Sequence, residues 1–158
     1  MFSVASTLIL LLFNLQGFAQ EPEIQAKFII QDFRFNKADY SEHMVKNKCY
    51  LAIYTVKGDK RVYFANVNPT ENTESYGDIF SLTDETIQGT DSTYKQEIYH
   101  FKWSYVNSYD KRKGTSTIRL VKIMKDAGIA FECTIIPENL DVLTYKGYME
   151  GTLKSLED

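Results

Sequence analysis

The fifteen residues Lys95–Tyr109, KQEIYHFKWSYVNSY, decide the fold class of this chain. Apolar and polar side chains alternate along them with a period of two, which indicates a half-buried β-strand. One face carries a row of aromatic residues, namely Tyr99, Phe101, Trp103 and Tyr105. Two interpretations of this row stay open. It is either part of a packed core or the wall of a cavity, where tyrosine hydroxyls and the tryptophan N–H would contact a ligand.

Similar alternation recurs through most of the chain, in segments rich in the β-branched and aromatic residues that strands favour. The predicted strands are Lys27–Phe35, Cys49–Val56, Arg61–Val67, Asp78–Leu82, Lys95–Tyr109, Thr115–Lys125, Gly128–Ile136 and Val142–Leu153. Short links such as Lys57–Lys60 and Asp126–Gly128 have the composition of hairpin turns. The pattern predicts an all-β fold, a single antiparallel meander of seven to eight strands closed as a small β-barrel. A two-sheet β-sandwich is the alternative.

Two connecting segments differ from this pattern. We expect Asn36–Lys48 to hold a turn or two of helix. The segment Asn68–Thr93 is rich in Asn, Thr, Glu and Asp, so we expect loops there on both sides of the short strand Asp78–Leu82.

The first twenty residues, MFSVASTLILLLFNLQGFAQ, indicate where the protein works. Val4–Phe13 is an apolar run shorter than the roughly 20 residues that a membrane span requires. Gly17 and Ala19 follow at the spacing that a signal peptidase reads. The pattern predicts a signal peptide over residues 1–19 and one all-β domain over residues 20–158, exported to the periplasm or the extracellular space. An uncleaved anchor is the alternative.

The overall charge narrows the class of partner. The formal net charge is −3, whereas proteins that bind nucleic acids present a basic surface, so we expect no nucleic-acid partner. No second apolar run has the length of a membrane span, so we expect none in the mature chain.

The chain has two cysteines, Cys49 and Cys133. An even number of cysteines in an exported protein suggests a disulfide. Each cysteine shares a predicted strand face with apolar residues, so both are expected to point inward. Two separate buried thiols are the alternative.

The strand Thr115–Lys125 allows two assignments of its faces. Ile118 and Leu120 favour one inward face, whereas Val121 and Ile123 favour the other, with a β-bulge near Leu120. The second assignment would turn Arg119 into the barrel, where it would need a carboxylate or an anionic ligand. Arg119 is therefore a candidate ligand contact only under that assignment.

Signals for catalysis are weak. The sequence lacks a nucleophile elbow, a phosphate-binding loop, a dinucleotide-binding turn and a zinc-protease motif. The two histidines, His43 and His100, are far apart and lie among polar residues. We expect no metal site, no cofactor and no enzymatic activity.

The stretches Tyr99–Tyr105, Asn107–Asp110 and Tyr145–Gly151 resemble small exported bacterial proteins of unknown function. The strand pattern of those proteins is similar to that of the lipocalin-like (calycin-type) barrels. The resemblance covers the last third of the chain and implies a barrel. It assigns no functional residue.

Together, these features predict an exported, non-catalytic binding protein that holds a small apolar or aromatic ligand inside a β-barrel. The candidate contacts are Tyr99, Phe101, Trp103, Tyr105 and Arg119. The alternative is a module with a filled core that binds a protein or an envelope component through its surface. An enzyme of unrecognised type is the third possibility.

Overall fold

The computed structural model describes residues 21–89 and 95–157. The predicted signal peptide and its cleavage point lie outside these residues. The strands are β1 (Pro22–Phe35), β2 (Ala38–Asp39), β3 (Tyr50–Val56), β4 (Val62–Asn68), β5 (Thr73–Gln88), β6 (Lys95–Asn107), β7 (Lys113–Lys125), β8 (Gly128–Pro137) and β9 (Leu143–Gly151). The helices are α2 (Ser41–Lys46) and the 3-10 helix η1 (Lys154–Leu156). In the part of the chain just given, no helix has the length and apolar character needed to cross a membrane.

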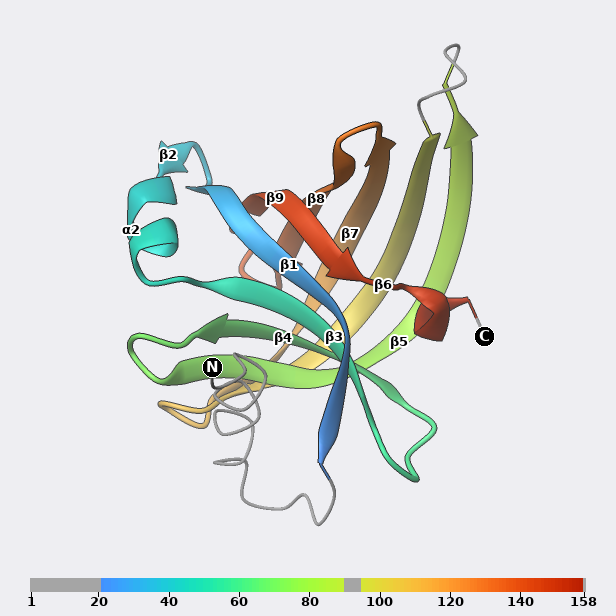
Figure 1. Cartoon of the computed structure of the whole chain (residues 1–158). Helices are drawn as coiled ribbons and strands as arrows, with labels where there is room; N and C mark the ends of the chain where they lie inside the picture. Colours follow the sequence, from blue (N-terminus) through green and yellow to red (C-terminus); the bar gives the residue numbers. More distant parts are fainter. Residues whose placement is uncertain (1–20, 90–94, 158) are drawn as a thin grey trace, which may run out of the picture.

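The strands form one antiparallel sheet that closes on itself (Figure 1). Each strand from β3 to β9 pairs with its neighbour in the chain, and β1 pairs with both β3 and β9. Among the described residues, eight strands therefore make a closed barrel, and β2 lies outside it against the end of β1. The predicted all-β barrel is confirmed. Closure gives each barrel strand a partner on both sides, whereas a sandwich would have had edge strands to protect.

The segment predicted as loops around a short strand is instead mostly one long strand. β5 runs over sixteen residues and pairs with β4 through its first part and with β6 through most of its length. Much of its second half is exposed, so polar residues there hide the alternation by which strands are recognised in a sequence. The backbone hydrogen bonds to β6 hold it extended despite a register shift between Phe80 and Thr83.

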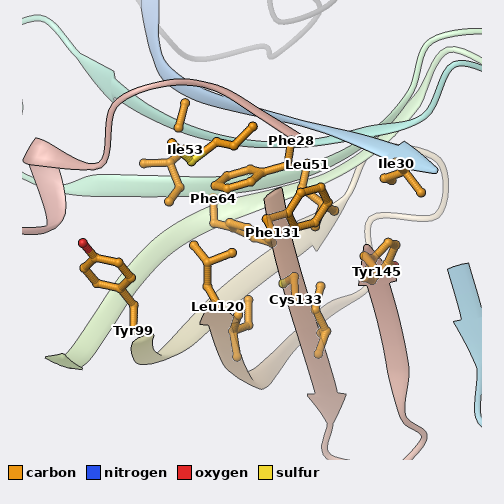
Figure 2. Packing of buried hydrophobic residues seen from close by; sticks show 14 of the residues in the cluster. Phe28, Ile30, Leu51, Ile53, Phe64, Tyr99, Leu120, Phe131, Cys133 and Tyr145 are labelled. Carbon is orange, nitrogen blue, oxygen red and sulfur yellow. The ribbon is translucent and has the colours of Figure 1, made fainter. Parts of the chain in front are cut away.

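The interior of the barrel is filled with side chains. Figure 2 shows Phe28, Leu51, Phe64, Phe131 and other buried residues packed together. Phe28 and Phe131 meet edge to face with ring centroids 5.1 Å apart. Eight-stranded barrels are just wide enough for side chains to fill them. The fold therefore has a solid core along most of its axis.

The two ends of the barrel differ. At one end, η1 follows β9, with Leu153 and Leu156 buried in the core, and the Tyr99 hydroxyl donates to Glu157 Oε1 at 3.3 Å. The other end, here called the mouth, carries the β4–β5, β6–β7 and β8–β9 connections. Helix α2 packs against β1 beside the mouth, with Met44 buried. Figure 1 shows α2 and the β4–β5 connection on the same side.

The two cysteines are buried, as predicted, but they are not bonded to each other. The predicted disulfide is therefore wrong. Cys133 lies on β8 and Cys49 directly precedes β3, so β9 and β1 lie between them. Three steps of about 4.8 Å between strands exceed the Cα separation of at most about 7 Å that a disulfide allows.

Arg119 is exposed on the outer surface of β7. β7 pairs with β6 and β8 without a register shift, so it has no bulge near Leu120. Ile118 and Leu120 consequently point into the core, and the assignment that would turn Arg119 inward is not adopted. Val121 and Ile123 instead form a small cluster with Ile98 on the outer surface.

Candidate functional site

Two adjoining hollows lie at the mouth of the barrel, each with a volume of about 270 Å³. They share five lining residues, which come from several elements: Asn66, Ser75, Tyr109, Leu143 and Tyr145. A hollow of about 310 Å³ beside the β7–β8 turn is lined mainly by small and apolar residues. Of the described residues that line this hollow, only Lys125 is charged, so the mouth offers more varied chemistry for a ligand.

Trp103 and Tyr105 line one of the two hollows at the mouth, which we call the mouth hollow, and neither of them lines the other. Their ring centroids are 4.8 Å apart, and Trp103 also meets Phe64 edge to face at 5.0 Å. The Trp103 indole N–H donates to the backbone carbonyl of Phe64 at 3.0 Å. Because this donor is already used, Trp103 can offer a ligand its ring but no hydrogen bond.

Polar side chains from different strands converge on the same hollow. Asn66 Nδ2 donates to the Tyr145 hydroxyl at 3.0 Å, and the Ser75 hydroxyl donates to Asn107 Oδ1 at 2.6 Å. Burial raises the pKa of Tyr145 far above its usual range, so its hydroxyl stays protonated and is able to donate in turn.

Ser116 supplies the least satisfied group of the hollow. Its side chain is on the inward face of β7, the residue is 2% exposed, and its Oγ has no hydrogen-bond partner among the described residues. Buried hydroxyls are normally paired, because an unpaired one costs about 1–3 kcal/mol. The Oγ is closed to solvent, so a ligand group or a water would supply the missing partner only after the neighbouring side chains move aside.

The rim of the mouth is charged and open. Tyr109 is 65% exposed, and Arg112 lies beside Asp110 with 3.6 Å between Nε and Oδ2. The hydrogen bond from the backbone N–H of Arg112 holds the pKa of Asp110 below its usual range. The rim is therefore an exposed ion pair above a mostly neutral hollow.

The structure divides the residues predicted to contact a ligand. Trp103 and Tyr105 line the mouth hollow, whereas Tyr99 and Phe101 are buried in the core, where Phe101 packs on Phe64. Arg119 lies on the outer surface and does not line the hollow. Tyr99 and Phe101 therefore belong to the core, and Trp103 both belongs to the core cluster and lines the hollow with Tyr105.

Sequence reasoning missed Asn66, Ser75, Ser116 and Tyr145, which line the hollow from β4, β5, β7 and β9. Only Ser116 left a signal. It shares the inward face of its strand with Ile118 and Leu120, and a polar residue at such a position is unusual. The other three belong to the hollow through strand pairing, which the local sequence does not report.

Within residues 21–89 and 95–157, no three His, Cys, Asp or Glu side chains are close enough together to hold a metal ion. His43 lies 3.9 Å from Glu71 and His100 lies 3.8 Å from Glu85, both pairs at the surface. The mouth hollow therefore offers shape, aromatic rings and hydroxyl groups. Comparisons of the chain with family models, with curated proteins and with solved structures gave no match.

Proposed function

We propose that the protein is an exported, non-catalytic binding protein that holds a small ligand at the mouth of its barrel. The observation that carries this proposal is the unpartnered hydroxyl of Ser116 in a hollow that Trp103 and Tyr105 also line. An aromatic or apolar part of the ligand would lie against the two rings. A hydrogen-bonding group of the ligand would reach the Ser116 hydroxyl once the side chains that close it from solvent move aside.

The volume of the hollow limits the ligand. At about 270 Å³ it lies just below the range of about 300–1,000 Å³ typical of ligand pockets. The ligand is therefore expected to be smaller than the drug-sized molecules that typical pockets hold. Below the hollow, the core is packed, so the ligand does not enter the barrel as it would in a deep calyx.

Two features of the sequence support the other parts of the proposal. The apolar run and the small residues at Gly17 and Ala19 support export. The lipocalin-like pattern supports a binding role, because barrels of this kind often hold one small ligand. The lack of any recognised catalytic motif supports the absence of enzymatic activity.

Native mass spectrometry of the protein purified from the exported fraction of its own host tests the proposal. We expect an added mass that is lost on denaturation. The variant Leu143→Phe should fill the hollow and remove that mass. Ile87→Phe is the matched control, because Ile87 is 46% exposed on β5, away from the mouth.

The only tryptophan gives a second readout, because Trp103 lines the hollow. Release of the ligand should change the Trp103 emission in the original protein and in Ile87→Phe, but not in Leu143→Phe. The proposal fails if no added mass is found, or if Leu143→Phe keeps it in full.

The filled core favours a second candidate function, a module that binds a protein or an envelope component through its surface. Exposed charges such as those of Arg119 and Arg112 would then contribute to binding. Binding of this kind should weaken as salt is raised from about 0.05 to 0.5 M. If raising the salt concentration leaves capture of the same partner unchanged, this second candidate function is contradicted.

A further inference from the structure

The second half of β5 has a partner strand on one side only. β5 pairs with β4 from Thr73 to Asp78, whereas its pairing with β6 continues to Gln88. Among the described residues, no strand pairs with the other side of residues 79–88. Figure 1 shows this part of β5 as the outermost strand, beside β6 and at the end of the barrel opposite the mouth. We call residues 79–88 the open edge.

The open edge is accessible and has backbone groups to offer. Residues 80, 81 and 83–88 are exposed. In an antiparallel pair, each strand directs the N–H and C=O groups of alternate residues towards its partner. The remaining residues of the open edge therefore direct theirs away from β6, where no described strand receives them. A row of such groups is a template for an added strand.

The usual protections of a strand edge are sparse here. Natural edges are blunted by lysine, by proline or by a bulge. The sequence of the open edge, IFSLTDETIQ, contains neither lysine nor proline. Its bulge lies at the start, between Phe80 and Thr83, and from Thr83 to Gln88 the register with β6 is unbroken. This regular stretch is about 20 Å long, which is the length of an ordinary strand.

The side chains of the open edge indicate what kind of strand would pair with it. Its two charged residues are the acids Asp84 and Glu85. Ile87, two residues beyond Glu85, is an apolar residue that is 46% exposed. Residues directly opposite each other on neighbouring strands are about 5 Å apart, and opposite charges at that distance stabilise the pair. A strand with two adjacent basic residues and an apolar residue two positions from one of them therefore matches this edge.

The basic residues of the neighbouring strand do not cancel this preference. Lys95, His100 and Lys102 lie on β6, one strand farther from an added strand than Asp84 and Glu85 are. Two strand spacings are about 10 Å, whereas charges in solution are screened beyond about 8 Å at physiological salt. His100 Nε2 lies 3.8 Å from Glu85 Oε1, but the two side chains are 45% and 58% exposed, so the carboxylate stays accessible.

The charge also argues against a second copy of this chain on the open edge. Two such edges paired about a two-fold axis would bring four carboxylates together, and neither edge contains a basic residue. Like charges on paired strands are destabilising.

We propose that the open edge binds an extended, basic polypeptide segment of another protein as an added β-strand. Backbone hydrogen bonds to β5 supply the attachment, and pairing of basic residues with Asp84 and Glu85 selects the partner. The open edge lies away from the mouth hollow, so this binding does not depend on a ligand at the mouth.

The peptide acetyl-TVTKRTV-amide is the probe. In an antiparallel register its first valine, its lysine and its arginine lie opposite Ile87, Glu85 and Asp84. Hydrogen exchange followed by mass spectrometry locates the binding. We expect saturating peptide to slow amide exchange in residues 79–88 by about tenfold and to leave β8 unchanged. The control acetyl-TVTEDTV-amide, which carries acids instead, should have no effect.

Two N-methylated forms of the probe separate strand pairing from attraction of charges alone. Each form carries methyl groups on alternate backbone nitrogens, in complementary patterns. One pattern removes the N–H groups that face β5 and should weaken binding by about tenfold or more, whereas the other removes those that face away and should change it little.

Two double variants test the acids. Asp84→Lys with Glu85→Lys should weaken binding of the basic probe by about tenfold and allow the acidic control peptide to bind. Asp126→Lys with Glu138→Lys makes the same change of net charge at two exposed turn residues and should leave binding of the basic probe unchanged. Unaltered far-ultraviolet circular dichroism shows that both variants are folded.

Four results would overturn the proposal. The first is no slowing of exchange in residues 79–88 at a probe concentration of about 1 mM. The second is equal binding of the two N-methylated forms, which would indicate attraction of charges without strand pairing. The third is an equal loss of binding in the two double variants. The fourth is a dimer of the protein alone that the probe dissociates, because a second copy would then occupy the open edge.

Discussion

Replacing Trp103 tests whether the outer half of the aromatic row supports the fold as well as lining the mouth. Trp103 is 3% exposed, packs at 5.0 Å from Phe64 and at 4.8 Å from Tyr105, and donates its N–H to the Phe64 carbonyl. Truncation of a buried tryptophan costs about 3–5 kcal/mol, and the lost hydrogen bond adds about 1 kcal/mol. We therefore expect Trp103→Ala to lower the free energy of unfolding by about 4–6 kcal/mol.

Trp103→Phe separates the two contributions. It keeps a ring beside Phe64 and Tyr105 but removes the donor, so we expect a smaller loss of about 1–2 kcal/mol. Tyr109→Ala is the control on the same rim. Tyr109 is 65% exposed, so its truncation should change the free energy of unfolding by at most about 0.5 kcal/mol.

Urea unfolding followed by far-ultraviolet circular dichroism measures these differences, since Trp103 variants lack the only tryptophan. With a slope of about 2 kcal/mol per molar urea, Trp103→Ala should lower the unfolding midpoint by about 2–3 M. A loss below about 1 kcal/mol in Trp103→Ala would refute the packing argument. If Trp103→Ala is destabilised as expected, a loss of ligand binding in that variant can come from unfolding rather than from the loss of a ligand contact. Leu143→Phe is then the better test of the hollow.

Three further predictions follow from single groups. The pKa of Glu74 is raised to about 7, so the folded state holds this proton more tightly than the unfolded chain, and the free energy of unfolding should fall by about 3 kcal/mol as the pH rises from about 4.5 through 7. Urea unfolding midpoints of Glu74→Gln, measured against pH, should lack this fall. Burial raises the pKa of the Cys49 thiol to about 11 and that of the Cys133 thiol further, so a thiol reagent should react slowly with the native protein. In the denatured protein the reagent should count two free thiols. If it counts none, the two cysteines form a disulfide. Gly77→Ala would place a methyl group against the backbone carbonyl of Ser104, so it should lower the free energy of unfolding by about 2–3 kcal/mol. Thermal unfolding measures this loss. An unchanged melting temperature would contradict the close approach of the two strands at Gly77.

The strands were readable from the sequence wherever one face is buried and the other is wet. β6 and β8 alternate in this way, and their predicted boundaries differ from the observed ones by at most about two residues. β5 was only partly predicted, because its exposed second half is polar on both faces. In β3 both faces are buried, so its sequence revealed a strand but not that its outward side belongs to a second cluster.

The candidate site was harder to predict, because a ligand-lining residue is defined by residues distant in the chain. The sequence around Tyr99 does not show that this side chain is buried in the core near η1. The sequence around Tyr105 does not show that it lines the hollow at the mouth. The position of each along the barrel axis depends on the stagger of the whole closed sheet.

By itself, the sequence determined the all-β class, the order of the antiparallel strands and the inward direction of both cysteines, because these follow from local alternation and short turns. The tertiary structure alone decided that Cys49 and Cys133 stay apart, since two strands lie between them. It also decided that the core is filled and that polar groups from β4, β5 and β7 meet Trp103 at the mouth. The reason is physical: closure of the sheet sets the distances between strands, and no single strand carries that information.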